Sequence, residues 1–195
     1  MSVNPYTISP AELELIEGCQ KGKAIYQEKL YKTFAPKMYA VCIRYSNSIE
    51  DAQDLLQEGF IKVYNYINKY RKEGSFEGWI RRIFVNTAIE YYRKSSNMYS
   101  VVELKTSIAV ENVDESAISQ ISSAELLKMV QQLSPGYRTI FNLYAIEGYN
   151  HKEIGELLGI SEGTSKSQLA RARMLLQKML IAAQSFRKES YVECI

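Results

Sequence analysis

The apolar residues of this sequence recur with a helical period along nearly the whole chain. Between residues 49 and 67 they fall at i, i+3 and i+4 spacings, which place them on one helix face: Ala52, Leu55, Leu56, Phe60, Val63 and Ile67. Stripes of the same kind cover residues 79–88, 126–133, 140–145, 154–158 and 169–179. No segment alternates apolar and polar residues as a half-buried strand does. The pattern therefore predicts an all-α fold.

Capping residues indicate where several helices begin and end. A Ser-Pro pair is typical of a helix start, because Ser caps free backbone N–H groups and Pro tolerates the first helical position; such pairs stand at Ser9-Pro10 and Ser134-Pro135. Further along, Gly148 and Gly159 are expected to end helices, and Asn150 and Ser161 are expected to begin the helices that follow them.

Residues 96–121 interrupt the helical pattern. The stretch "SNMYSVVELKTSIAVENVDESAISQI" is rich in Ser, Asn and Val, and its four acids face a single Lys105. It is longer than a connection within a compact domain usually needs. We therefore expect a flexible acidic linker between two small helical domains, residues 9–95 and 122–186, and a frayed tail from Arg187 to Ile195.

Composition excludes several classes of protein. No apolar run approaches the length of a membrane span, and the N-terminus lacks the basic start and apolar core of a secretory signal. Cys19, Cys42 and Cys194 are too widely spaced for a CxxC metal site and odd in number for a disulfide framework. We expect a protein of the reduced cytoplasm, with no membrane insertion, no metal and no cofactor.

The spacing near the C-terminus predicts a helix-turn-helix. A short helix over 151–158 is followed by a three-residue turn, 159–161, and a second helix over about 162–180. From Thr164 to Lys188 the chain has six Lys or Arg and no Asp or Glu, although its net charge is only +2. A carboxylate there would repel phosphate, and the N-terminal part of such a helix enters the major groove. The alternative is a basic, solvated helix in an ordinary bundle.

The outer face of this second helix carries the candidate DNA contacts. Its apolar stripe leaves Lys166, Ser167, Ala170 and Arg171 facing outwards. Small residues allow the backbone close to the groove, while Lys and Arg reach phosphates and guanine edges.

The helix "SIEDAQDLLQEGF" carries acids along one side. Asp51, Asp54 and Glu58 lie opposite its apolar stripe, beside Gln57. One interpretation is a solvated face whose charges stabilise the helix N-terminus. The other is a docking surface for a basic partner.

The next helix, "GWIRRIFVNTAIEYYRKSS", is basic, and a loop bracketed by glycines, "KYRKEGSFEG", precedes it. Cations interleaved with aromatic rings suit an unstacked single strand. Trp79 is expected in the core, whereas Tyr70 and Phe76 are undecided between packing and base stacking. Asn86 either contacts the edge of a flipped base or is a buried amide satisfied by the loop backbone.

Taken in order, three stretches resemble an extracytoplasmic-function (ECF, group 4) sigma factor of bacterial RNA polymerase, in the sigma-70 family. They are "DAQDLLQEGFIKVY", "YRKEGSFEGWIRRIFVNTAIEYYRK" and "LSPGYRTIFNLYAIEGYNHKEIGELLGISEGTSKSQLARARMLLQ". The resemblance covers about residues 9–183. It implies a sigma-70 region 2 over 9–95, which binds core polymerase and opens the minus-ten element. It also implies a region 4 over 122–186, which recognises the minus-thirty-five element and contacts the β flap.

The resemblance and the residue patterns above together assign residues to these tasks. Contacts to the β′ clamp helices fall on Asp51, Asp54, Gln57 and Glu58. Contacts to the minus-ten single strand fall on Arg71, Lys72, Ser75, Phe76, Arg82, Asn86 and Arg93. Contacts to the minus-thirty-five duplex fall on Thr164, Lys166, Ser167, Gln168, Ala170, Arg171 and Arg173. Ser165 and Gln168 depart from the family's frequent Val and Arg, which leaves the promoter sequence open.

The implied partners are core RNA polymerase, promoter DNA and an anti-sigma factor, which is common in the family. The alternative is a stand-alone helix-turn-helix regulator, which would typically dimerise on a palindrome. An enzyme is not expected, because His151 is the only histidine available as a general base, and no phosphate loop, metal cluster or nucleophile triad accompanies it.

Overall fold

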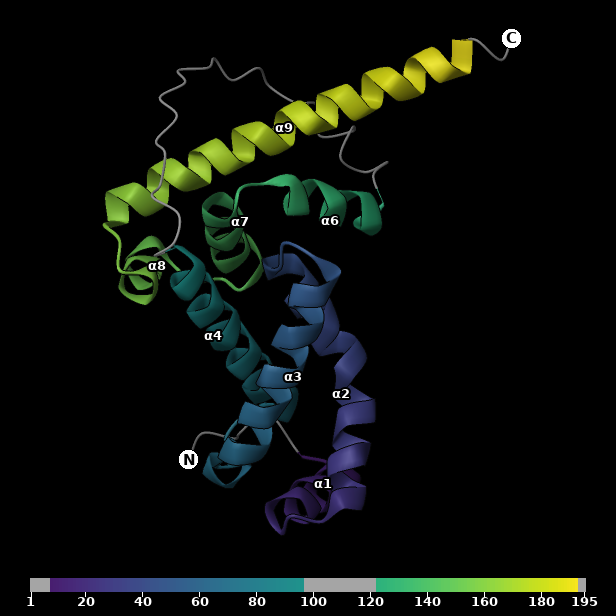
Figure 1. Cartoon of the computed structure of the whole chain (residues 1–195), viewed down its shortest axis with the longest axis vertical. Coiled ribbons are helices and arrows are strands. Elements are labelled where there is room, and N and C mark those ends of the chain that lie inside the picture. The colour runs from purple at the N-terminus through teal and green to yellow at the C-terminus, as the bar shows by residue number, and fades with distance from the viewer. Residues whose placement is uncertain (1–7, 97–121, 193–195) are drawn as a thin grey trace. The chain divides into compact units, whose positions relative to one another are not determined.

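The computed structural model describes residues 8–96 and 122–192, and every regular element within those ranges is helical (Figure 1). The all-α prediction is confirmed. The chain divides into two compact units, residues 1–91 and 92–195, so the division falls within one helix. Apart from Ser96, the expected acidic linker lies outside the described residues, and its flexibility and the domain boundaries stay predictions.

Unit 1 is a bundle of long helices. Its elements are α1 (Pro10–Gln20), α2 (Ala24–Tyr45), α3 (Ile49–Tyr66), the 3₁₀ turn η1 (Ile67–Lys69) and α4 (Phe76–Ser96). Ser9 begins α1 as predicted, with its hydroxyl accepting from the Glu12 amide at 3.2 Å. Ser48 caps α3 in the same way, accepting from the Asp51 amide at 3.0 Å.

Aromatic rings fill the core of unit 1. Phe34 and Phe76 meet edge to face at 5.7 Å between ring centroids, and Phe60 meets Phe84 in the same manner at 5.2 Å. The predicted stripe of α3 is buried, apart from Leu56, which is half-buried. Gly59 lets α4 approach α3 closely, because a Cβ at that position would lie 2.3 Å from the Phe84 ring.

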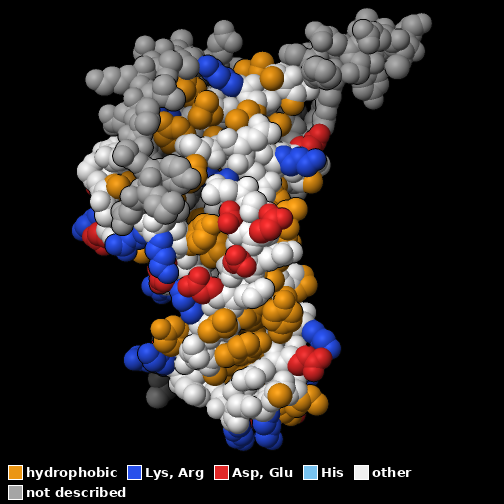
Figure 2. Space-filling model, viewed as in Figure 1, with side chains coloured by type: hydrophobic (Ala, Val, Ile, Leu, Met, Phe, Trp, Pro, Cys, Tyr) orange, Lys and Arg blue, Asp and Glu red, His pale blue; other side chains and the backbone are white. Residues whose placement is uncertain are grey.

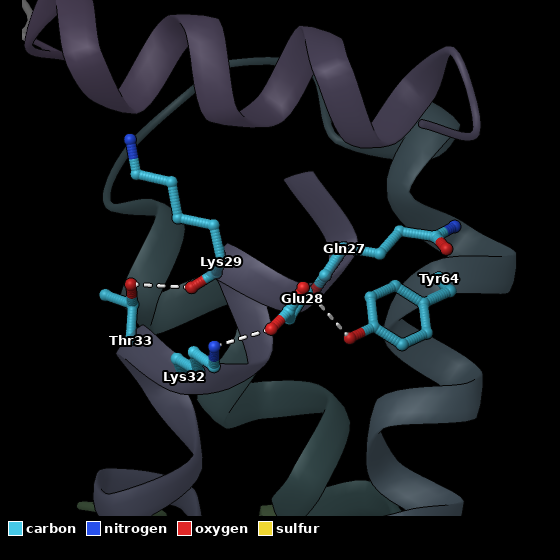
Figure 3. A network of polar contacts seen from close by, with 6 residues as sticks. All are labelled: Gln27, Glu28, Lys29, Lys32, Thr33 and Tyr64. Carbon is cyan, nitrogen blue, oxygen red and sulfur yellow. Dashed lines mark hydrogen bonds and ion pairs between the residues drawn. The ribbon is translucent and has the colours of Figure 1, made fainter. Parts of the chain in front are cut away.

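A hydrogen bond between helices ties the first half of α2 to α3. The Tyr64 hydroxyl of α3 donates to the Gln27 carbonyl of α2 at 3.0 Å, beside the ion pair of Glu28 with Lys32 (Figure 3). Burial raises the pKa of Tyr64 to about 12, so this hydroxyl keeps its proton and remains a donor. The contact therefore fixes α3 against α2 at physiological pH.

Unit 2 holds the predicted helix-turn-helix. Its elements are α6 (Ser123–Gln132), α7 (Pro135–Phe141), the π-helical turn η2 (Asn142–Ile146), α8 (His151–Leu158) and α9 (Glu162–Val192). Its core joins α6 to α9 through Met129, Val130, Leu133, Ala172, Leu176 and Leu180.

The predicted caps of this unit have the expected geometry, with one exception. Asn150 forms a capping box with Glu153 at the start of α8, and Gly159 ends the helix in the left-handed region at φ 70°. Ser161 accepts from the Thr164 amide at 3.0 Å at the start of α9. Ser134 stands at the start of α7, but its side chain makes no capping hydrogen bond.

Two predictions about the C-terminal region are wrong. The second helix of the motif was expected to end near Leu180, and the tail from Arg187 was expected to fray. Instead α9 continues to Val192. The physical reason is local, because residues 181–192 contain neither Gly nor Pro to stop a helix.

Candidate polymerase and nucleic-acid interfaces

The turn between α8 and α9 is held by backbone contacts. The Ile160 amide donates to the Gly155 carbonyl at 3.0 Å. A Cβ at Gly155 would lie 2.8 Å from the Ile160 carbonyl oxygen, so the turn packs against α8 as closely as a residue without a side chain allows.

The first turns of α9 separate a buried face from an outer face. Ser165, Leu169 and Ala172 point into the unit and are at most 3% exposed. The predicted DNA-contacting residues divide by exposure: Lys166, Ser167, Ala170 and Arg173 are exposed, and Thr164, Gln168 and Arg171 are half-buried. All seven therefore avoid the fully buried face, as a duplex-contacting helix requires; their contacts with DNA stay a prediction.

An acid that the sequence analysis did not single out sits at the start of α9. Glu162 pairs with Lys166 at 2.7 Å, and both side chains are more than half exposed. The hydrogen bond from Lys166 and its charge lower the pKa of Glu162. Because the two residues are four apart on one helix, the pair was readable from the sequence. Any phosphate that approaches Lys166 competes with this carboxylate.

Ser165 takes part in a polar contact that explains a hydroxyl at a buried position. Its Oγ lies 3.0 Å from Nδ1 of His151, the first residue of α8. The His151 ring stacks on Tyr144 at 4.5 Å between centroids, and the Arg173 guanidinium lies 5.5 Å from the centre of the same Tyr144 ring. His151 therefore links the two helices of the motif.

The acidic face of α3 divides into paired and solvent-facing residues. Figure 2 shows acidic side chains gathered over α3, next to a patch of hydrophobic side chains. Asp54 and Gln57 are exposed. Asp51 is half-buried and accepts from the Tyr91 hydroxyl at 2.7 Å, whereas Glu58 pairs with Lys62 at 3.0 Å.

Two side-chain contacts tie α3 to α4, one through Asp51 and one through Lys62. The hydrogen bond to Asp51, reinforced by burial, raises the pKa of Tyr91 to about 12. Lys62 also reaches Glu90 of α4 at 2.8 Å. Burial lowers the pKa of Lys62, but its hydrogen bonds to Glu90 and Glu58 outweigh that effect and raise it overall. Of the four predicted polymerase contacts, Asp54 and Gln57 are therefore the two whose side chains are exposed to a partner.

Asn86, which was predicted to contact a flipped base, lies on the exposed face of α4. Arg82 and Asn86 are both exposed and lie four residues apart, on the same side of the helix. The alternative of a buried Asn86 is wrong, because the core of α4 is filled by apolar side chains on the opposite side. Arg93, near the end of α4, is also exposed.

Phe76 corrects the predicted single-strand site. It is 1% exposed and packs between Phe34, Tyr70 and Trp79, with its ring stacked on Trp79 at 5.8 Å. A ring enclosed on both sides leaves no face for a base, so its assignment as a DNA contact is wrong. Tyr70 is 5% exposed and belongs to the same cluster.

Three residues of the loop before α4 that were predicted to contact the minus-ten single strand lie at the surface. Arg71, Lys72 and Ser75 are exposed. Lys72 has a left-handed backbone at φ 61° and pairs with Glu17 at 3.2 Å, whereas the Ser75 hydroxyl caps α4 by accepting from the Gly78 amide at 3.2 Å. Ser75 thus has a structural role besides its predicted one.

Within residues 8–96 and 122–192, no helix is long and apolar enough to cross a membrane. In the same ranges, no group of three or more His, Cys, Asp or Glu side chains is placed to hold a metal ion. Cys19 and Cys42 are both buried with free thiols, and burial raises the pKa of Cys19 to about 11 and that of Cys42 to about 12.

Comparison with known proteins identifies both units. Residues 30–98 match the family model "Sigma-70 region 2", and residues 123–176 match "Sigma-70, region 4". The chain is 31% identical over 167 residues to the ECF RNA polymerase sigma factor SigE of Mycolicibacterium smegmatis, which covers 84% of this chain and 65% of that relative. It is 27% identical over 176 residues to the ECF RNA polymerase sigma factor SigW of Bacillus subtilis, which covers 85% and 94%.

Among solved structures, this chain is similar to the sigma factor RpoE in complex with the anti-sigma factor NepR from Bartonella quintana. The match covers 78% of this chain and 95% of the other chain. The TM-score is 0.48 and the identity 22%. Two family models match in the order region 2 then region 4, and the two relatives cover 84% and 85% of the chain. The chain belongs to the ECF group of the sigma-70 family.

Proposed function

We propose that this protein binds core RNA polymerase and directs promoter-specific initiation of transcription. The observation that carries the proposal is the pairing of two different surfaces in one chain. One is a helix-turn-helix with an acid-poor outer face, and the other is α4 with Arg82 and Asn86 exposed side by side. A regulator that only binds duplex DNA has no use for the second surface.

The proposed division of labour follows the two units. Residues 9–95 dock on polymerase through α3, chiefly through Asp54 and Gln57, and hold the opened minus-ten strand near Asn86. Residues 122–186 place the start of α9 in the major groove of the minus-thirty-five element. The linker of residues 96–121 connects the two. This assignment is supported by the exposure of the residues concerned and by the order of the two family regions.

The proposal includes no catalytic step by this chain. His151, the single histidine of the chain, contacts Ser165 and stacks on Tyr144. The polymerase performs the chemistry. Because polymerase and DNA lie in the bacterial cytoplasm, we place the protein there, and we include an anti-sigma factor among its partners as an expectation from the family.

Run-off transcription tests the function directly. Core polymerase is incubated with fragmented genomic DNA with and without the protein, and the 5′ ends of the transcripts are mapped. Promoter-specific starts that require the protein, upstream of which a shared pair of elements appears, support the proposal. Binding to a symmetric site without polymerase, and no change in the starts, would instead identify a stand-alone regulator.

A further inference from the structure

An exposed arginine of α9 lies against an aromatic ring of η2. The guanidinium carbon of Arg173 is 5.5 Å from the centre of the half-buried Tyr144 ring. Among the described residues no carboxylate pairs with Arg173, whereas Lys166, two turns earlier on α9, pairs with Glu162 at 2.7 Å. The charge of Arg173 is therefore held beside a neutral ring and is not offset by an acid of the described ranges.

The backbone that carries the Tyr144 ring is anchored in the core of unit 2. Tyr144 lies in the π-helical turn, in which the Glu147 amide donates to the Asn142 carbonyl at 3.0 Å. The two residues before Tyr144, Asn142 and Leu143, are 0% exposed. Turns of this kind are rare and are frequent at functional sites. The ring therefore projects from a fixed point of the fold.

A chain of side-chain contacts joins the ring to the buried face of α9. The His151 ring stacks on Tyr144 at 4.5 Å between centroids, with 24° between the ring planes. Nδ1 of His151 lies 3.0 Å from Oγ of Ser165, which is 0% exposed. Ser165 and Arg173 belong to the same helix, so the contacts fix the Tyr144 ring relative to the helix that carries the arginine.

Arg173 lies on one side of α9, between its buried and outer faces. It follows Lys166 by seven residues, which places both cations on the same side of the helix, and its neighbour Ala172 is buried. When the start of a helix enters the major groove, cations along its sides meet the phosphates that border the groove. A flexible arginine loses conformational freedom when it binds a phosphate, and a ring that already holds it reduces that loss.

We infer that Tyr144 is a positioning residue, which holds the Arg173 guanidinium ready for a phosphate of the minus-thirty-five duplex. This inference rests on the proposed function and adds to it a residue that lies outside the helix-turn-helix and does not itself contact DNA. Because phosphates carry no sequence information, Tyr144 strengthens binding without changing which bases are preferred.

The test uses the full chain and five variants. Tyr144→Leu removes the ring, and Tyr144→Phe keeps it without the hydroxyl. Arg173→Gln removes the cation, and a double variant combines Tyr144→Leu with Arg173→Gln. Lys128→Gln is the matched control for the lost charge, since Lys128 is an exposed lysine of α6 in the same unit. Circular dichroism on heating checks the fold, and Tyr144→Met, which keeps bulk without a ring, replaces Tyr144→Leu if that variant unfolds.

The first readout needs no polymerase. Fluorescence anisotropy measures binding of the protein to a short labelled duplex of mixed sequence over a range of salt. We expect Tyr144→Leu to weaken binding by roughly 2- to 12-fold, the cost of ordering one flexible side chain, with the salt slope unchanged because the phosphate contact still forms. Tyr144→Phe should bind as the wild type does. Arg173→Gln should reduce the salt slope by about 0.9, and Lys128→Gln should leave it unchanged.

The double variant separates positioning from a general structural role. If Tyr144 acts through Arg173, Tyr144→Leu has no further effect in the Arg173→Gln background, because the ring then has no guanidinium to hold. A ring that only supports the fold of the helix-turn-helix would instead weaken binding equally in both backgrounds. That result, or wild-type binding by Tyr144→Leu, would overturn the inference and leave the sigma function standing.

The second readout uses holoenzyme on a promoter found by run-off transcription. Tyr144→Leu should lower the affinity for the promoter duplex by the same factor as for the mixed-sequence duplex, and substitutions in the minus-thirty-five element should rank as they do with the wild type. A changed ranking would contradict a role through phosphate alone. If the wild-type protein directs no specific starts, the proposed function fails, and the anisotropy series still decides whether Tyr144 acts through Arg173.

Discussion

Gly59 of α3 sits against the ring of Phe84, and this contact sets the distance between α3 and α4. A Cβ at Gly59 would meet three ring atoms of Phe84 at 2.3–2.6 Å, closer than carbon atoms approach in folded proteins. The ring has little freedom to retreat, because it is 1% exposed and packs edge-on against Phe60. Gly59→Ala therefore tests whether this core is as tightly packed as the geometry indicates.

Two opposing terms decide the sign of the effect. Helix propensity favours Ala over Gly by about 1 kcal/mol within a helix. Overpacking of a filled core typically costs about 1–3 kcal/mol, and three ring contacts below 2.7 Å put this site at the upper end of that range. We therefore expect Gly59→Ala to lower the free energy of unfolding of unit 1 by about 2 kcal/mol.

Urea unfolding followed by tryptophan fluorescence measures this change. Trp79 is the single tryptophan of the chain and lies in unit 1, so its signal follows the unit that contains Gly59. Gly78→Ala is the matched control. Its Cβ would lie 3.5 Å from its nearest neighbour, so propensity alone should act and stability should hold or rise slightly.

A double-mutant cycle sharpens the argument. Phe84→Leu removes the opposing ring, so Gly59→Ala should cost at least about 1 kcal/mol less in that background than in the wild type. A Gly59→Ala protein as stable as the wild type, or an equal cost in both backgrounds, would refute the reasoning.

Three further predictions concern the proposed interfaces. Asp54→Lys should weaken binding to core polymerase in a pull-down while helical content stays unchanged, whereas Asp51→Asn should lower the free energy of unfolding by about 1 kcal/mol, because it weakens a hydrogen bond to a charged acceptor. Arg171→Ala should cost roughly 1–3 kcal/mol in promoter affinity and relax sequence preference, and Lys166→Ala should reduce the salt slope by about one; wild-type binding by both would contradict the recognition-helix assignment. Asn86→Ala should fold and bind core polymerase normally but lose permanganate reactivity of the melted strand, and full reactivity would remove Asn86 from the site.

Features that depend on neighbours in sequence were predictable here. The start of α8 at Asn150 and its end at Gly159 follow from cap chemistry within four residues, and the buried stripe of α3 follows from helical spacing. The same local logic indicated that α9 begins after Ser161. Its full length was missed because the apolar stripe weakens after Leu180, although no residue there stops a helix.

Features that depend on distant residues were not predictable. Whether Phe76 stacks on a base or packs in the core is decided by Phe34, which lies forty-two positions earlier. The exposure of Asn86 follows from which side of α4 meets α3, and periodicity alone left that amide undecided. Likewise, the acid stripe of α3 did not show that Asp51 is engaged by Tyr91.

The contacts between α3 and α4 also bear on how the two proposed surfaces of unit 1 work together. Asp51 accepts from Tyr91 at 2.7 Å, and Lys62 bridges Glu58 of α3 and Glu90 of α4 at 3.0 and 2.8 Å. One end of each contact lies beside the proposed polymerase-docking residues, and the other lies on the helix that presents the proposed base-reading amide. Lys62 also neutralises Glu90, an acid that would otherwise repel a strand passing along α4. Because these contacts join the two proposed surfaces directly, we expect polymerase binding to position α4 for DNA without a rearrangement inside the unit.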